Sequence, residues 1–506
     1  MSKPVRVRFA PSPTGGLHLG GVRTVLYNYL FARQHHGKFI LRIEDTDQSR
    51  FVPGAEEYIQ DCLKWCGIEP DESPVHGGNY GPYRQSERKL MYRQYAAQLA
   101  KQGHAYYAFD TPEELEAMRS EFKTAENPSP QYGQGIREKM KNSISLDEAE
   151  TQKLLDAGVP HVIRIKMPDD EVIGFTDMIR GAVNFNTSQS DDKVLLKADG
   201  MPTYHLAVVV DDYLMKITHA FRGEEWLPSA PVHLLLWKYL GWEDDMPQWA
   251  HLPLILGPDG AKLSKRHGSK YGFPIFAMNW TDLAKNDFTE GFRERGFLPE
   301  AFINLLAVLG WNDSTPQEIY TKDELVHAFS MDHVHKGGAQ FDFEKAKWYN
   351  HEWIKKTDNS ILVQRLKEFE PGHYANLDVD YLQQVVGLIK ERCTMLSDFW
   401  QQSSFFFQAP ETIDTDTIKP KWSDDKTAFF DIVKEKLLLL EDWTTVNIEE
   451  TFKQTAIEKE LKVGELQLPF RIMLVGGKFG PGVFEIAGLI GKEETVNRII
   501  KVVSIL

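Results

Sequence analysis

The N-terminal part of the chain changes its hydrophobic pattern along its length. Apolar and basic residues alternate over residues 5–9, and this period predicts a strand with one face in a core. From Val22 onward, apolar residues recur three and four positions apart, which predicts a helix with one apolar stripe. Residues 38–43 have strand character again. Strand, glycine-rich turn, helix and strand together predict a βαβ unit with a right-handed crossover.

The turn between this strand and this helix has two pairs of glycines, at 15–16 and 20–21. The N-terminus of the helix carries free N–H groups and the positive end of the helix dipole, and it is expected to face the carboxyl ends of the strands. His18 lies at that edge, and Gly20 and Gly21 let a ligand approach the backbone. The pattern predicts a nucleotide phosphate site. An ordinary tight turn with a surface histidine is the alternative.

Later segments predict further elements. Spacing and composition indicate helices at 55–65, 87–102 and 111–122, a loop at 127–135, and strands at 162–166 and 172–186. Residues 202–212, an apolar run between polar flanks, are predicted to form a buried strand. Together these elements predict an α/β Rossmann-type domain that is split by an α+β insertion.

Beyond residue 271 the chain is predicted to be largely helical. Residues 381–400 illustrate this, because their apolar positions share one helical stripe: Leu382, Val385, Val386, Ile389, Cys393 and Leu396. The glycine-rich segment 475–482 lacks the spacing of a phosphate-binding loop, so it is interpreted as a connection between helices.

Composition narrows the function classes. With 506 residues, the chain is expected to form roughly three or four domains. The net charge of −15 argues against a general nucleic-acid binder but leaves a local basic path open. No apolar run approaches the ~20 residues that span a bilayer, and residues 1–9 lack the apolar segment of a signal peptide. Three cysteines cannot form a disulfide framework, so a reducing, cytoplasmic setting is expected.

A second candidate for chemistry lies in the glycine- and proline-containing loop at 257–268. It places Lys262 and Lys265 three positions apart, with Ser264 between them. Two ammonium groups on a mobile loop can follow the charge that builds up on a leaving pyrophosphate. A loop with ordinary surface lysines is the alternative.

Taken together, the two segments have a recognisable pattern. His-Leu-Gly-Gly at 18–21 and Lys-Leu-Ser-Lys-Arg at 262–266 resemble the HIGH and KMSKS signatures of class I aminoacyl-tRNA synthetases. Further motifs resemble the glutamyl-tRNA synthetase branch of that family, and they lie at 8–15, 42–47, 81–87, 204–206 and 222–226.

The resemblance implies a class I synthetase fold: a Rossmann-type catalytic domain split by an α+β insertion and followed by an all-α C-terminal anticodon-binding region. It implies catalytic halves at 1–105 and 201–255, an acceptor-arm-binding insertion at 106–200, a stem-contact region at 256–340 and an anticodon-binding domain at 341–506.

The resemblance also implies an activity, the ATP-dependent ligation of L-glutamate to the 3′ end of tRNA-Glu through glutamyl-adenylate, with Mg²⁺ accompanying the ATP. By similarity, catalysis and ATP binding are assigned to His18, Gly20, Gly21, Lys262, Ser264 and Lys265.

Glutamate binding is assigned by similarity to a second group. Glu44, with Ser12 near it, matches the residue for the α-ammonium, and the set around the γ-carboxylate is Arg8, Tyr204 and Arg222. A guanidinium suits a carboxylate bidentately, whereas a glutamine amide would turn donors toward donors. Core packing of Tyr204, and pairing of Arg222 with Glu224 or Glu225, are the alternatives.

Some positions depart from the family pattern. Gly21 at the fourth HIGH position removes a second histidine contact to ATP, and Val208 is apolar where some relatives have a polar side chain. Residues 101–200 contain no cysteine, so no structural zinc is expected.

In the helical C-terminal third, Arg392 and Arg471 lie near the arginines thought to read anticodon bases, and surface helix charges are the alternative. The resemblance suggests a monomer that binds tRNA-Glu and neither DNA nor membranes. Two other functions stay open: glutamylation of a modified tRNA base, and a non-catalytic synthetase-derived tRNA-binding protein.

Overall fold

The computed structural model describes residues 3–282 and 286–506. The chain divides into two compact units. The first contains the residues up to 292 together with 302–343, and the second contains 293–301 and 344–506. Within the described residues, no helix combines the length and the apolar character needed to cross a bilayer.

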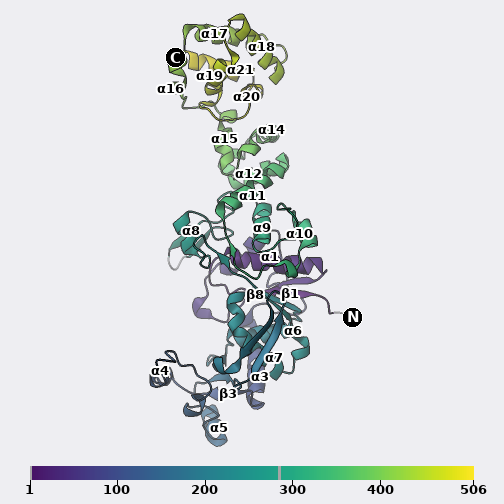
Figure 1. Ribbon diagram of the computed structural model, residues 1–506, viewed down its shortest axis with the longest axis vertical. Coiled ribbons are helices and arrows are strands. Elements are labelled where there is room, and N and C mark those ends of the chain that lie inside the picture. The colour runs from purple at the N-terminus through teal and green to yellow at the C-terminus, as the bar shows by residue number, and fades with distance from the viewer. Residues whose placement is uncertain (1–2, 283–285) are drawn as a thin grey trace. The chain divides into compact units, whose positions relative to one another are not determined.

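A parallel four-stranded sheet forms the centre of the first unit. Its order is β2 (Lys38–Leu41), β1 (Arg6–Phe9), β8 (His219–Gly223) and β9 (Gln248–Leu252). Helix α1 (Leu19–Gln34) connects β1 to β2, and α7 (Ala230–Tyr239) lies between β8 and β9. The two connections run in opposite directions, so the strand order reverses between β1 and β8, which Figure 1 shows side by side. Ligands of open α/β sheets bind at such a point.

The predicted βαβ unit is confirmed, with two differences. Helix α1 begins at Leu19 and not at Val22, so Gly20 and Gly21 lie in its first turn. Strand β1 is buried on both faces: Val7 is fully buried, and Arg6 and Arg8 are 9% and 4% exposed. The arginine face is therefore not solvated. It is buried because carboxylates of the same unit pair with both guanidinium groups.

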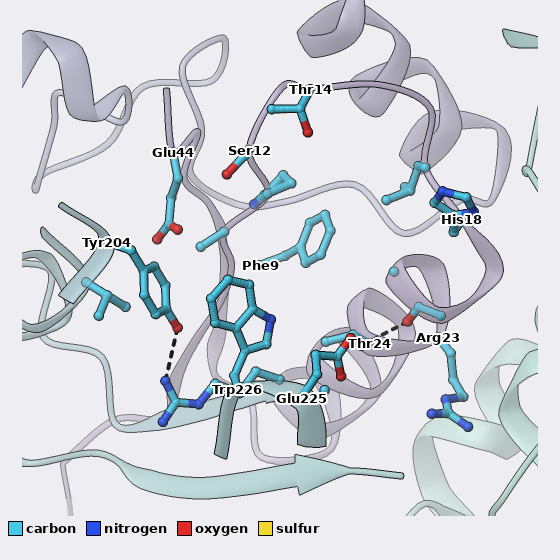
Figure 2. Close-up of a pocket in the computed structure, with 18 of the residues that line it drawn as sticks. Phe9, Ser12, Thr14, His18, Arg23, Thr24, Glu44, Tyr204, Glu225 and Trp226 are labelled. Carbon is cyan, nitrogen blue, oxygen red and sulfur yellow. Dashed lines mark hydrogen bonds between the residues drawn. The ribbon is translucent and has the colours of Figure 1, made fainter. Parts of the chain in front are cut away.

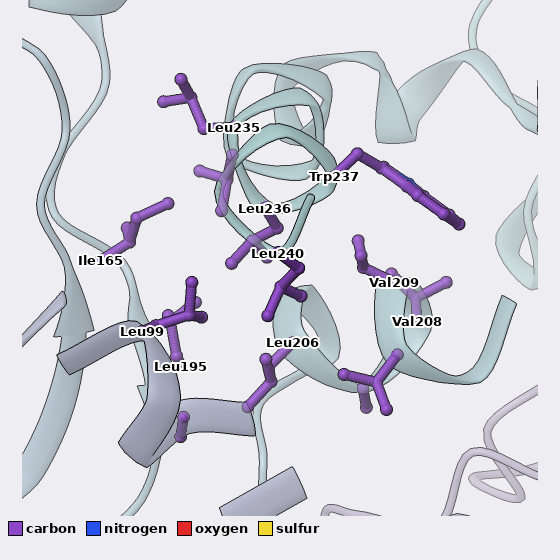
Figure 3. Close-up of a cluster of buried hydrophobic side chains, with 14 of the residues drawn as sticks. Leu99, Ile165, Leu195, Leu206, Val208, Val209, Leu235, Leu236, Trp237 and Leu240 are labelled. Atoms are coloured by element: carbon purple, nitrogen blue, oxygen red, sulfur yellow. The ribbon is translucent and has the colours of Figure 1, made fainter. Parts of the chain in front are cut away.

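The predicted strand at 202–212 is wrong, because this segment is helix α6 (Tyr204–Leu214). Every residue from Leu206 to Asp212 is buried, so the helix has no polar face to reveal its period. A short apolar run of this kind cannot be assigned from periodicity. The helix packs in a core whose members come from α3 (Lys89–Lys101), α6, α7, the three-stranded sheet of the insertion and strands β8 and β9. Figure 3 shows Leu99, Leu206, Leu235 and Leu236 of this core.

The inserted region has an α+β structure, as expected. Its antiparallel sheet has the order β3 (Ala105–Ala108), β4 (Val162–Ile165) and β7 (Val194–Leu196). The predicted strand region 172–186 is confirmed as an antiparallel hairpin, β5 (Val172–Asp177) and β6 (Gly181–Asn186). Its helices are α4 (Pro112–Glu121) and α5 (Glu148–Asp156).

Several shorter elements complete the chain up to residue 343. They are α2 (Ala55–Trp65), β10 (Ile255–Leu256), α8 (Lys265–Tyr271), β11 (Trp280–Asp282), β12 (Asp287–Thr289), α9 (Pro299–Val308), α10 (Lys322–Ala328) and β13 (Ala339–Gln340).

The second unit is helical. Its helices are α11 (Phe343–Lys356), α12 (Asn359–Phe369), α13 (Pro371–Tyr374), α14 (Val379–Ile389), α15 (Asp398–Phe407), α16 (Thr415–Ile418), α17 (Asp424–Leu438), α18 (Thr445–Glu458), α19 (Val463–Val475), α20 (Val483–Ile490) and α21 (Lys492–Val503). Figure 1 shows α17 to α21 gathered in one bundle. The segment 476–482 connects α19 to α20, as predicted.

The single helix predicted for 381–400 is wrong. Helix α14 ends at Ile389, and α15 begins at Asp398. The carboxylate of Asp398 accepts the backbone N–H groups of Thr394 and Met395 at 2.7 and 2.8 Å, which stabilises the turn between the two helices. All six residues of the predicted stripe are nevertheless buried. The pattern therefore predicted burial correctly and continuity incorrectly.

The core around α6 generates a stability prediction. Leu206→Ala is expected to lower the free energy of unfolding of the first unit by about 2–5 kcal/mol, because Leu206 is fully buried and its truncation leaves a cavity. Leu90→Ala is the matched control, since Leu90 lies on α3 and is 79% exposed, and it should stay within ~0.5 kcal/mol of wild type. Urea unfolding of both variants checks this, and equal effects would contradict the packing described.

Candidate active site

A pocket of about 1200 Å³ opens at the carboxyl ends of β1 and β8. In Figure 2, Glu44, Ser12 and Tyr204 lie toward one end and His18 toward the other, with Trp226 between them. Most of the predicted site residues line it: Arg8, Ser12, His18, Gly20, Gly21, Glu44, Tyr204, Arg222, Lys262 and Ser264. Segments that are far apart in the sequence therefore meet in one cavity.

Arg8 is anchored by a carboxylate of helix α6. Its Nε and Nη2 donate to the two carboxylate oxygens of Asp212 at 3.1 and 3.2 Å. Arg42, which follows β2, donates from Nη1 to the same carboxylate at 2.8 Å and from Nη2 to Glu44 at 3.1 Å. Burial alone would raise the pKa of Asp212, but the charges of Arg8 and Arg42 outweigh it and lower that pKa.

The neighbouring carboxylate, Asp211, belongs to the same buried group. It accepts hydrogen bonds from Arg88 at 2.7 Å, from Gln85 at 2.8 Å and from the hydroxyl of Tyr92 at 2.9 and 3.0 Å. For Glu44 the balance differs, because burial raises its pKa more than Arg42 and Arg8 lower it. Glu44 is therefore incompletely neutralised, and a cationic ligand group at this position would be stabilised.

Arg222 lies at the end of β8 and is held by neutral groups. Its Nε donates to His251 at 3.0 Å, and its Nη1 donates to the hydroxyl of Tyr204 at 3.1 Å and to His233 at 3.2 Å. Its Nη2 is buried and has no hydrogen-bond partner among the described residues. The side chain lines the pocket, so this N–H group is free to donate to a ligand oxygen.

The histidines around Arg222 are neutral. Burial lowers the pKa of His251 and moves that of His233 well below its ordinary value, and the positive charge of Arg222 adds to both shifts. Burial also lowers the pKa of His205, which contacts His233, to about 4. Neutral imidazoles can accept hydrogen bonds from the guanidinium, which a protonated ring cannot do.

His18 is the N-cap residue of α1, and its imidazole carries no capping bond. Burial lowers the pKa of His18, and the positive charges of Lys262 and Lys265 lower it further. Lys262 lines the same pocket as His18, although more than 240 residues separate the two in sequence. A side chain at Gly20 would project into open space, so nothing covers the first turn of α1 there.

The lysine loop is held by hydrogen bonds of its own. His267 accepts the backbone N–H of Ser264 on Nδ1 at 3.1 Å, and its Nε2 lies 2.9 Å from Asp259. Lys262 donates to Glu225 at 2.8 Å, whereas Lys265 pairs with Asp287 and does not line the pocket. Both ammonium groups therefore have carboxylate partners, and of the two partners Glu225 lines the pocket.

Sequence reasoning missed several residues of the site. Asp211 and Asp212 were included only in a predicted strand, yet two acids directly after an apolar run indicate buried cationic partners. Trp226 lies within the motif at 222–226 but was given no role, and Lys197, outside the motifs, carried no sequence signal. His251 on β9 and His233 on α7, which bind Arg222, carried no sequence signal either.

In the helical unit, Arg471 stabilises the connection between α19 and α20. Its Nη1 donates to the backbone carbonyls of Phe479, Gly480 and Pro481, at 3.2, 3.1 and 2.5 Å. Burial, and then the charge of Arg392, lower the pKa of Arg471, so these two arginines are electrostatic neighbours. Arg392 itself is exposed.

Two family models match the chain. The model described as "tRNA synthetases class I (E and Q), catalytic domain" matches residues 4–348, and the model described as "Anticodon binding domain" matches residues 361–503.

Curated proteins and solved structures resemble the chain over its whole length. A glutamate–tRNA ligase of Amoebophilus asiaticus is 51% identical and covers 99% of this chain and 98% of its own. A glutamate–tRNA ligase of Flavobacterium johnsoniae is 50% identical, with complete coverage of both. A crystal structure of a glutamate tRNA ligase from Elizabethkingia meningosepticum, in complex with its amino acid, has a TM-score of 0.94 at 48% identity and covers 99% of both chains.

The neutral state of His205 generates a prediction of pH dependence. Its pKa is about 4 in the folded protein and about 6.5 when unfolded, so below pH 6.5 the unfolded chain binds a proton that the folded protein does not. The stabilisation is complete above pH 6.5 and is lost as the pH falls toward 4. His205→Gln should therefore lose roughly 2 kcal/mol less stability than wild type between pH 7.5 and 4.5.

Urea unfolding at both pH values measures this difference. His327→Gln is the control, because His327 is exposed on α10 of the same unit, and it should follow wild type. If His205→Gln also follows wild type, His205 does not stay neutral in the fold.

Proposed function

The chain belongs to the class I tRNA synthetases for glutamate and glutamine, and we infer from this that it catalyses the attachment of glutamate to tRNA in translation. The observation that carries this inference is the identity of about 50%, over the full length, to proteins named glutamate–tRNA ligase. The matched catalytic and anticodon-binding regions give the chain both parts that such a ligase needs.

We propose that glutamate binds at the end of the pocket that contains Glu44 and Arg222. Glutamate has one cation and two anions, so its site needs one carboxylate and separate anion donors. Glu44, with Ser12 beside it, is assigned to the α-ammonium, which would supply the positive charge that this buried carboxylate lacks. The unpartnered Nη2 of Arg222 is assigned to the γ-carboxylate.

Tyr204 and Arg8 complete this end of the pocket in the proposal. The hydroxyl of Tyr204 accepts from Arg222, so its own hydrogen is left for a ligand oxygen. Arg8 already donates to Asp212 and contributes mainly positive charge. Because these groups offer donors, the amide nitrogen of glutamine would be opposed by N–H and O–H groups, and glutamate should be selected.

ATP is proposed to bind at the other end, against the first turn of α1. Backbone N–H groups at Gly20 and Gly21, together with the side chains of His18 and Ser264, would hold its phosphates. The glutamate α-carboxylate then attacks the α-phosphorus, which forms the carboxyl–phosphate bond of glutamyl-adenylate and breaks the bond to pyrophosphate. Lys262 and Lys265 would leave their carboxylate partners and neutralise the charge on the pyrophosphate.

Mg²⁺ generally accompanies ATP in this class. Within the described residues, no group of three or more His, Cys, Asp or Glu side chains is placed to hold a metal. Mg²⁺ is commonly held by phosphates, water and only one or two carboxylates, so the residues fit a metal that arrives with the nucleotide. We assign Glu225, the pocket carboxylate next to Lys262, as its protein ligand. When bound, the ion would neutralise phosphate charge.

The remaining regions are proposed to bind tRNA-Glu. The insertion at 106–200 would bind the acceptor arm and 256–340 the stem, and the helical region 341–506 would bind the anticodon. In the second step, the 2′-hydroxyl of the terminal adenosine attacks the glutamyl carbonyl, an ester forms, and AMP leaves. Arg392 and Arg471 are proposed anticodon contacts, because neighbouring guanidinium groups suit unstacked bases and phosphates.

The two alternative functions receive no support from the comparisons. The relatives that match over the full length are named glutamate–tRNA ligases, and the matched anticodon-binding region goes beyond the catalytic core that would glutamylate a modified tRNA base. We also propose a cytoplasmic monomer that binds neither DNA nor membranes. Three free, buried cysteines suit a reducing compartment.

Aminoacylation of purified tRNA-Glu and tRNA-Gln with glutamate tests the function directly. We expect ATP-dependent charging of tRNA-Glu, accompanied by glutamate-dependent exchange between ATP and pyrophosphate. A chain that is folded but charges neither tRNA would contradict the proposed function. Charging of tRNA-Gln in the same assay would define the range of tRNA substrates.

Arg222→Ala is expected to lower kcat/KM for glutamate at least ~100-fold, because the variant loses a charged hydrogen-bond partner of the substrate. Aminoacylation at saturating ATP and tRNA, over a range of glutamate concentrations, measures this. Arg93→Ala is the control, since Arg93 is exposed on helix α3 and does not line the pocket, and it should keep wild-type kinetics for glutamate. A change below threefold in Arg222→Ala would remove Arg222 from the glutamate site.

Lys265→Ala is expected to lower kcat while ATP binding stays nearly intact, because Lys265 is assigned to charge that develops in the transition state. Exchange kinetics give kcat, and equilibrium binding of ATP gives the affinity. Lys270→Ala is the matched control on the same short helix, α8, and should keep kcat within threefold of wild type. A loss of ATP affinity that accounts for the whole defect would contradict the transition-state role.

A further inference from the structure

A chain of hydrogen bonds runs from the inserted hairpin to Arg222. Asp177, the last residue of β5, is buried, and its Oδ2 lies 2.6 Å from Nδ1 of His251. The same oxygen accepts the backbone N–H of His251 at 3.0 Å. On the other side of the ring, Nε2 of His251 lies 3.0 Å from Nε of Arg222. The imidazole of His251 thus links Asp177 of the insertion to Arg222 of the pocket.

The chemistry of the three side chains determines the position of each proton in this series of hydrogen bonds. The Nε of arginine can only donate, so Nε2 of His251 must be the accepting nitrogen. A neutral imidazole then carries its hydrogen on Nδ1, which donates to Asp177. Asp177 stays ionised, because the bond from His251 and the backbone N–H groups of Arg180 and Ile179 outweigh burial and lower its pKa. Its carboxylate can therefore only accept.

The two oxygens of Asp177 have separate tasks. Oδ1 accepts the backbone N–H groups of Ile179 and Arg180, at 2.9 and 3.0 Å, and this holds the turn of the hairpin. Oδ2 holds His251. The hairpin is further bound to strand β9, since Nε of Arg180 donates to the carbonyl of His251 at 3.2 Å and the N–H of Met178 donates to the carbonyl of Trp249 at 2.8 Å.

This arrangement fixes the plane of the Arg222 guanidinium. His251 holds Nε, while Tyr204 and His233 hold Nη1, so only Nη2 is left without a partner. With the other tautomer, His251 would present an Nε2–H group to the Nε–H of Arg222. The two donors would repel each other, and the guanidinium would lose the contact that orients its free edge.

We propose that Asp177 and His251 are positioning residues for recognition of the substrate carboxylate, and that they act through Arg222. This proposal rests on the proposed function, in which Nη2 of Arg222 binds the γ-carboxylate of glutamate. It assigns the inserted hairpin a part in amino-acid selection, because the hairpin carries the carboxylate that sets the tautomer.

The first test is Asp177→Asn in the full-length chain. If the asparagine oxygen faces the turn, its NH₂ group faces Nδ1 of His251 and drives that ring to the other tautomer. If the oxygen faces His251, the NH₂ group opposes the backbone N–H groups of Ile179 and Arg180. We expect the KM for glutamate to rise at least tenfold, while the KM for ATP stays within threefold of wild type. Asp170→Asn is the matched control, because Asp170 is exposed just before β5, and it should keep the wild-type KM for glutamate.

A double-mutant cycle separates positioning from a purely structural role. In an Arg222→Ala background, Asp177→Asn should change the KM for glutamate less than threefold, since the residue through which it acts is absent. An equal effect in both backgrounds would overturn the proposal.

Two substitutions of His251 keep the test decisive if Asp177→Asn does not fold. The amide nitrogen of His251→Asn can replace Nδ1 and keep the bond to Asp177, but it leaves Arg222 without an acceptor. The amide oxygen of His251→Gln can replace Nε2 and accept from Arg222. We expect at least a tenfold rise in the KM for glutamate in His251→Asn and at most a threefold rise in His251→Gln. The reverse order would overturn the proposal.

The two levels of inference fail separately. If the wild-type chain does not charge tRNA-Glu, or if Arg222→Ala keeps its KM for glutamate, the proposed function of the pocket fails. If both of those results are as expected and Asp177→Asn has a wild-type KM for glutamate, only the positioning role fails.

Discussion

The first unit depends on one buried group of charges, in which three arginines face three carboxylates: Arg8, Arg42 and Arg88 with Glu44, Asp211 and Asp212. Charges are expensive to bury, and removing one member leaves its partner uncompensated, at a cost on the order of 3–5 kcal/mol. The arginines come from the segments before the insertion, whereas Asp211 and Asp212 come from helix α6 after it. The two halves of the catalytic region are therefore joined by ion pairs as well as by the pairing of β1 with β8.

Glu44 of this group and Arg222, which lies outside it, determine what the pocket attracts. Burial raises the pKa of Glu44, and Arg42, which shares its charge among three carboxylates, offsets this only in part. Arg222 is bonded instead to two imidazoles and a phenol, which leave its positive charge intact. One end of the pocket thus combines an incompletely neutralised carboxylate with an incompletely neutralised guanidinium. A small ligand that has both an ammonium and carboxylates satisfies both of them.

Local patterns predicted the βαβ unit, the glycine turn at His18, the strand character of 172–186 in the insertion and the helical C-terminal region, because period and turn chemistry are local properties. They failed at α6, where burial on all sides removes the period, and at the break between α14 and α15, where a carboxylate stabilises a turn inside a continuous apolar stripe. Most of the site residues that the family motifs identified line one pocket. Their partners were not predictable, because pairs such as Arg8 with Asp212 are 204 positions apart and depend on the tertiary fold.

The two ends of the pocket differ in how firmly their cations are held. Arg8 is buried in a bidentate ion pair, and Arg222 is fixed at three points, so neither can exchange partners without breaking buried bonds. Lys262 is 57% exposed, and its pair with Glu225 is of the surface kind that contributes about 0–1 kcal/mol. A triphosphate can therefore displace the partners of the loop lysines at little cost. In the proposed function, selection of the amino acid therefore rests on groups whose geometry is set before binding, and neutralisation of the leaving group rests on groups that are free to move with the charge.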